Sequence, residues 1–157
     1  MSHAWALIGF FVLCFASAGV GSAFTSPGIP WLATLKQPPF QPPNWIFGPV
    51  WTLLYAMMSV SGWLVFSQPP SPKRSQALVL FAIQLVLNVA WSLLFFYLRL
   101  PFIACVEIVA LLAVIWIYVF TARGISATAA YLFVPYGLWV GFATALTGAL
   151  WYLNRAA

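Results

Sequence analysis

The sequence predicts an all-α integral membrane protein, a bundle of five transmembrane helices with a proline- and tryptophan-rich first loop folded over it as a lid. Of the 157 residues, 64% are hydrophobic and only 4% are charged, whereas a soluble domain carries about 25% charged residues. The apolar residues fall into five runs, each close to the roughly 20 residues that a helix needs to cross a bilayer. We therefore expect one multi-pass domain over residues 1–157.

The first apolar run covers residues 4–24 and is predicted to be a retained membrane helix. A stretch at residues 16–18 resembles a signal-peptide cleavage site. No Lys or Arg precedes the run, however, and its apolar character continues past that stretch. Small residues recur along one stripe of the run, at Gly9, Ala16, Gly19 and Ala23. Such a stripe lets another helix approach closely.

Residues 25–43 are predicted to be a connection, because their prolines are too dense for a spanning helix. The segment also holds Trp31, Lys36 and Phe40. Loops of this length are usually functional or disordered. The apolar and aromatic content of this one favours a folded lid on the bundle.

The other four helices are expected at residues 44–67, 75–98, 101–121 and 126–153. Asn44 is a plausible N-cap for the first of these four. Pro101 suits the opening of a helix, and Pro135 is expected to interrupt the last one. Five spans place the termini on opposite sides of the membrane. The basic residues divide three to each side, so the positive-inside rule gives no orientation.

The polar inventory excludes most catalytic and metal sites. The chain has no Asp, one Glu, one His and two widely separated Cys, so no catalytic triad, carboxylate pair or metal-ligand cluster is expected. The six basic residues stand at the ends of apolar runs, which is typical of membrane flanks and not of a nucleic-acid surface. We expect the lipid bilayer as a partner and no nucleic acid.

Three predicted helices each carry a stripe of aromatic or amide side chains. One face of residues 75–98 has Gln84, Asn88, Trp91 and Phe95 at helical spacing. The amides fit either interhelical hydrogen bonds or the few polar contacts of an apolar ligand cavity. Similar faces occur in two other helices, with Trp51 and Tyr55 in one and Trp139, Ala143 and Leu146 in the other. Three such faces favour the cavity.

Glu107 is the one acidic residue, and it lies inside the predicted helix 101–121. An acidic residue inside a membrane is a functional candidate. Two interpretations of Glu107 are about equally good. Its side chain contacts a ligand, or it is simply protonated, hydrogen-bonded or long enough to reach the membrane interface.

Three ordered sequence blocks resemble the TspO family, the tryptophan-rich sensory proteins whose mitochondrial members are called translocator protein or peripheral benzodiazepine receptor. The blocks are FQPPNWIFGPVWTLLY at residues 40–55, QLVLNVAWSLLFF at 84–96 and VPYGLWVGFATAL at 134–146. The resemblance implies a five-helix bundle, commonly homodimeric, with a cavity beneath the first loop. In the family this cavity binds porphyrins, haem-related tetrapyrroles and, in some members, sterols or benzodiazepine-site ligands.

Carried over position by position, the resemblance implies a pocket built from the first loop and from three helices. Its residues would be Trp31, Pro42, Pro43, Trp45, Phe47, Trp51, Tyr55, Gln84, Asn88, Trp91, Phe95, Trp139, Ala143 and Leu146. Lys36 would be the cation for the propionates of a porphyrin. The chain has Thr147 and Gly148 where the family usually has Asn and an aromatic residue, and Gly148 and Tyr152 where the family's sterol motif has Tyr and Arg. The resemblance therefore leaves the binding of sterols open.

The resemblance thus favours a membrane receptor or carrier for protoporphyrin IX or haem, with a sensory or transport role and no covalent cofactor. Two alternatives stay open. One is light-dependent porphyrin degradation, with Trp51 and Trp139 as redox-active neighbours of the ligand. The other is a scaffold or stress-signalling subunit.

Overall fold

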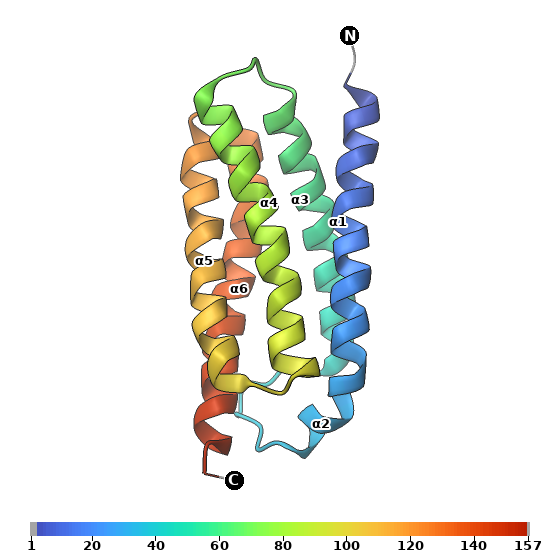
Figure 1. The fold of residues 1–157 in the computed structure, drawn as a ribbon, viewed down its shortest axis with the longest axis vertical. Helices are drawn as coiled ribbons and strands as arrows, with labels where there is room; N and C mark the ends of the chain where they lie inside the picture. The colour runs from blue at the N-terminus through green and yellow to red at the C-terminus, as the bar shows by residue number, and fades with distance from the viewer. Residues whose placement is uncertain (1–2, 157) are drawn as a thin grey trace.

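The computed structural model describes residues 3–156, and in it the chain forms a bundle of long helices that run between two ends (Figure 1). The five long helices are α1 (Ala4–Thr25), α3 (Phe47–Phe66), α4 (Pro72–Ser92), α5 (Pro101–Arg123) and α6 (Ala127–Asn154). Each is long and apolar enough to cross a membrane, and no strand occurs within residues 3–156. The termini lie at opposite ends of the bundle. The predicted all-α, five-span membrane architecture is confirmed.

Helix α1 is the most peripheral of the five. It packs against α3 and α4, while α5 packs against α4 and α6, and α3 packs against α6 (Figure 1). Only 11% of the most apolar stretch of its span is buried inside the molecule, against 33–39% for the other four spans. Most of its surface is therefore left for lipid or for another protein.

The half of the bundle that holds the N-terminus is filled by side chains. The rings of Tyr118 and Phe133 lie 4.2 Å apart, and both residues are fully buried. Ser61 donates a hydrogen bond to the carbonyl of Ala129 (2.7 Å) and accepts one from the Tyr118 hydroxyl (2.9 Å). Close rings and the paired hydroxyls of Ser61 and Tyr118 pack this half as a solid core.

The first connection is more helical than predicted. From α1 the chain passes through a 3₁₀ turn, Ser26–Gly28, into the short helix α2 (Ile29–Thr34). Part of the predicted connection is thus helical, since Pro27 and Pro30 stand in the first turns of these two elements, where a missing N–H costs no hydrogen bond. The irregular part is residues 35–43, here called loop 1.

Two helix starts differ from the prediction. Asn44 does not cap α3: it begins a 3₁₀ turn, Asn44–Ile46, and its side chain makes no capping hydrogen bond. Helix α4 starts at Pro72 and not near residue 75, because the hydroxyl of Ser71 accepts a hydrogen bond from the backbone N–H of Arg74 (3.1 Å) and Pro72 suits the first helical turn.

The ends of two helices also depart from expectation. Helix α4 changes into a π-helical turn, Leu93–Tyr97, a rare conformation that occurs mostly at functional sites. The predicted interruption of the last helix at Pro135 is wrong, since α6 is continuous from Ala127 to Asn154. Proline is tolerated in membrane helices, where neighbouring groups take up the freed backbone carbonyl.

Candidate ligand-binding cavity

A cavity of about 510 Å³ lies in the half of the bundle next to α2 and loop 1. All five long helices contribute to its wall, together with α2, loop 1 and the π-helical turn. Its volume falls within the range of about 300–1,000 Å³ that is typical of small-molecule sites. No charged side chain is among the described residues that line it.

Aromatic rings form much of the wall. Trp91 and Phe95, from α4 and the π-helical turn, are stacked with 5.2 Å between ring centroids and 10° between ring planes. On the other side Phe47 and Trp139 meet edge to face at 5.8 Å. Trp51 also lines the cavity. The wall therefore offers flat apolar surfaces from several helices, which suits stacking against a planar ligand.

A buried chain of hydrogen bonds joins three helices at the cavity end that faces the solid core. The Tyr55 hydroxyl donates to Asn88 Oδ1 (3.1 Å), and Asn88 Nδ2 donates to the Tyr136 hydroxyl (2.7 Å). Tyr55 and Asn88 also line the cavity. Asn88 therefore links the helices and also lies in the cavity wall, while its contact with a ligand stays a prediction.

Nine of the residues singled out from the sequence line the cavity, and they come from the three helices expected to supply its wall. They are Phe47, Trp51, Tyr55, Asn88, Trp91, Phe95, Trp139, Ala143 and Leu146.

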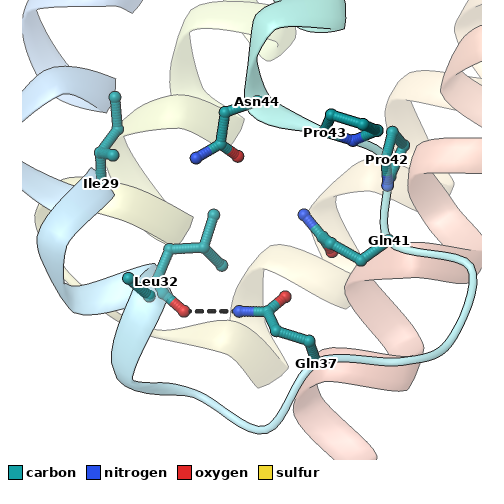
Figure 2. Close-up of a pocket in the computed structure, with 8 residues that line it drawn as sticks. Ile29, Leu32, Gln37, Gln41, Pro42, Pro43 and Asn44 are labelled. Atoms are coloured by element: carbon teal, nitrogen blue, oxygen red, sulfur yellow. Dashed lines mark hydrogen bonds between the residues drawn. The ribbon is translucent and has the colours of Figure 1, made fainter.

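Four other candidates lie around the lid. Trp31 packs edge to face on Phe95 (5.6 Å) and supports the wall from behind. Pro42 and Pro43 line a smaller, neighbouring pocket (Figure 2). The side chain of Lys36 is exposed and is not among the cavity-lining residues, so its role as the cation for propionates stays a prediction.

The remaining two candidates lie away from the cavity. Trp45 is 73% exposed, because the 3₁₀ turn before α3 carries it on the outer surface. Gln84 is fully buried one helical turn before Asn88, in the packed half, and its amide has no hydrogen-bond partner among residues 3–156. Gln84 thus contributes neither to the cavity wall nor to an interhelical hydrogen bond.

The buried polar atoms without partners within the described chain also include the indole N–H of Trp91 and the carboxyl oxygens of Glu107. Trp91 lines the cavity and Glu107 does not. Trp91 thus contributes to the cavity wall although its N–H is itself buried, and Glu107 lies outside the wall.

Helices α1 and α5 supply wall residues that the sequence did not reveal. Phe15, Ala18 and Ser22 come from α1, and Ile108 and Leu111 from α5. These helices are apolar on every side, so no contrast between faces marked the one that lines a cavity. Gly9 and Gly19 of the small-residue stripe lie elsewhere on α1, with open space where a side chain would stand. Pairing with a second copy stays a prediction.

Some residues of the cavity wall are also exposed. They are Ser22 of α1 and Gly48 and Thr52 of α3, two helices that pack against each other. Towards the N-terminal end of the bundle, Phe15 of α1 and Tyr55 of α3 lie with ring centroids 6.2 Å apart.

Loop 1 is tied to the end of α6 by one side chain. Asn154 accepts a hydrogen bond from the backbone N–H of Lys36 (2.9 Å) and donates one to the Lys36 carbonyl (3.1 Å). The two residues are 118 positions apart in the chain, so this pair ties the lid to the C-terminal end of α6.

Replacing Asn154 by alanine is expected to loosen loop 1. Two hydrogen bonds to Lys36 are lost, and each is worth about 0.5–1.5 kcal/mol. The fraction of molecules in which loop 1 is detached from α6 should therefore rise roughly tenfold, and the rate of proteolytic cleavage in the loop should rise with it. Trypsin reports this directly, because Lys36 is the only Lys or Arg before residue 73. The neighbouring Arg155→Ala, which removes a guanidinium lying over Tyr152, should leave the rate unchanged. Equal rates for both variants and the wild type would contradict the assignment.

Comparison with known proteins agrees with this architecture over nearly the whole chain. The model of the TspO/MBR family matches residues 10–153. The chain is 37% identical over 150 residues to the tryptophan-rich protein TspO of Chlorobaculum tepidum, covering 90% of this chain and 91% of that protein. It is 33% identical to a tryptophan-rich sensory protein of Cereibacter sphaeroides (98% and 95% covered) and 32% identical to the translocator protein of Bos taurus (94% and 89%).

Proposed function

Because this chain belongs to the TspO/MBR family, we propose that its cavity binds a porphyrin or a related tetrapyrrole and that the protein acts as a membrane receptor or carrier for it. The observation that carries the proposal is the set of aromatic faces around one uncharged cavity, Trp91 and Phe95 on one side and Phe47 and Trp139 on the other. A flat apolar macrocycle gains most from such faces.

An apolar macrocycle dissolves in the bilayer, and it would enter between α1 and α3, where residues of the cavity wall are exposed. The relatives named translocator protein and tryptophan-rich sensory protein favour a transport or sensory role for such binding. The amide of Asn88 would orient the ligand within a largely apolar space.

A titration of the detergent-solubilised protein with protoporphyrin IX in the dark tests the proposal. We expect saturable quenching of tryptophan fluorescence, with a shift of the Soret band, at about one ligand per chain. Trp139→Phe should weaken binding roughly three- to tenfold, since an aromatic contact is worth about 0.5–1.5 kcal/mol. The matched control is Trp5→Phe, because Trp5 is 68% exposed and lies at the opposite end of the bundle.

One result would overturn the proposal. The quenching of tryptophan fluorescence would rise without saturation, and equally for an unrelated helical membrane protein, because the porphyrin only partitions into the micelle.

A further inference from the structure

Three of the six Lys and Arg residues lie at the end of the bundle that holds the N-terminus. Lys73 and Arg74 stand in the first turn of α4, and Arg123 ends α5, which runs antiparallel to α4 beside it (Figure 1). Arg74 is used within the protein, because its Nε and Nη2 atoms donate hydrogen bonds to the Phe66 carbonyl (3.1 and 2.7 Å). Lys73 and Arg123 are exposed and remain for other partners.

Gly124 lets the Lys73 ammonium lie against the turn between α5 and α6. A Cβ atom at Gly124 would collide with Lys73 Nζ, so the ammonium occupies the space that any other side chain would fill. Gly124 has φ −78° and ψ 0°, the angles of an ordinary turn, so only the close approach of the lysine requires a glycine here. Lys73 thus adds a second cation to the turn that follows Arg123.

The protein supplies no anion for these two cations within residues 3–156. Glu107, the one acidic residue, lies about 24 Å from Arg123 along α5, and α6 carries the chain to the opposite end of the bundle (Figure 1). The last carbonyls of α5 are also occupied, since those of Thr121 and Ala122 accept hydrogen bonds from backbone N–H groups of the turn. Two like charges at one turn repel each other, so an external anion would stabilise them.

The surface of α5 next to this turn is apolar. Phe120 and Ile117 precede Gly124 by one and two helical turns, on the same face of α5, and both side chains are exposed. In a spanning bundle they face the acyl chains, while the end of the helix lies at the level of the lipid headgroups. A phospholipid can therefore contact both the cations and the apolar surface, whereas a free phosphate ion can contact the cations alone.

We propose that Lys73 and Arg123 bind the phosphate group of an anionic phospholipid at the α5–α6 turn, and that Gly124 positions the lysine for it. An acyl chain of the lipid lies along Phe120 and Ile117. Cationic side chains at a membrane surface attract anionic lipids, and a zwitterionic lipid such as phosphatidylcholine fits less well because its own ammonium group neutralises its phosphate. The site is in the half of the bundle opposite the cavity, so the inference is independent of porphyrin binding.

Acetylation of lysine, followed by mass spectrometry, reports on this site because the chain has two lysines, Lys36 in loop 1 and Lys73. An ammonium must lose a proton to react, and a bound phosphate opposes that loss. The full chain is placed in nanodiscs of phosphatidylcholine alone or of an equimolar mixture with phosphatidylglycerol. An anionic surface slows both lysines alike, so the ratio of the Lys73 rate to the Lys36 rate reports the bound lipid. We expect phosphatidylglycerol to lower this ratio about fivefold in the wild type.

Two variants separate the geometry of the site from its charge. Gly124→Ala keeps every charge but displaces the Lys73 ammonium, and Arg123→Gln removes the second cation. In each variant phosphatidylglycerol should change the ratio less than about twofold. Gly19→Ala, where a Cβ atom meets nothing within 4 Å, and Arg155→Gln, which removes a cation at the other end of the bundle, are the matched controls and should keep the wild-type response.

The bundle should stay folded in Gly124→Ala, because the colliding group is the far end of a flexible side chain, and an unchanged unfolding temperature checks this. An equal effect of phosphatidylglycerol on both lysines of the wild type, or a wild-type response in Gly124→Ala or Arg123→Gln, would overturn the site. Inorganic phosphate added to the phosphatidylcholine nanodiscs should leave the ratio unchanged. A drop equal to that caused by phosphatidylglycerol would assign the turn to a soluble anion and overturn the lipid.

Discussion

Replacing Ala143 by phenylalanine is expected to weaken porphyrin binding at least about 100-fold while the bundle stays folded. Ala143 lines the cavity on α6, within one helical turn of Trp139 and Leu146. A phenyl ring at this position enters the space that the macrocycle would occupy. The loss corresponds to about 2.7 kcal/mol of binding free energy, and it is measured as the dissociation constant for protoporphyrin IX in the dark titration.

The matched control is Ala145→Phe, the same substitution two positions further along α6. Ala145 is exposed and does not line the cavity, so the added ring faces lipid and should leave the dissociation constant within about twofold of the wild type. Unchanged affinity in Ala143→Phe would show that porphyrin binds elsewhere. Full cellular function in a variant that no longer binds porphyrin would favour the scaffold role over a receptor or carrier.

The fold could be predicted well from the sequence because its determinants are local. A run of apolar residues of membrane length has few alternatives to a spanning helix, so all five helices lie where they were expected. The structure is more helical than expected where a proline stands in the first turn of a helical element, as at Pro27, Pro30 and Pro72. At that position proline is compatible with a helix, so counting prolines overestimates the length of a loop.

The candidate site could be predicted only in part, because a cavity depends on which helix faces meet and at what depth. Gln84 and Asn88 share a face of α4, yet only Asn88 lines the cavity. One helical turn separates the solid core from the open space. In α1 and α5 nearly every residue is apolar, so the wall positions Phe15 and Leu111 look like any lipid-facing residue in sequence.

Substituting alanine for Gly28 should detach α2 from the π-helical turn and destabilise the lid half of the bundle. A Cβ atom at Gly28 would lie 2.6 Å from the carbonyl oxygen and 2.8 Å from the Cα of Phe96, and backbone atoms cannot move aside as a side chain can. Gly28 has ordinary helical backbone angles, so the effect is steric and not conformational. Overpacking of this kind costs about 1–3 kcal/mol.

The same displacement should reach the ligand site, because α2 carries Ile29 and Leu32 in the cavity wall and Trp31 against Phe95. We expect a lower unfolding temperature, faster tryptic cleavage at Lys36 and weaker porphyrin binding together in Gly28→Ala. Gly19→Ala is the control, since Gly19 is also helical and a Cβ there meets nothing within 4 Å. The unfolding temperature and the rate of tryptic cleavage could instead be the same in Gly28→Ala and Gly19→Ala. In that case the close approach of α2 to the π-helical turn does not hold the lid in place.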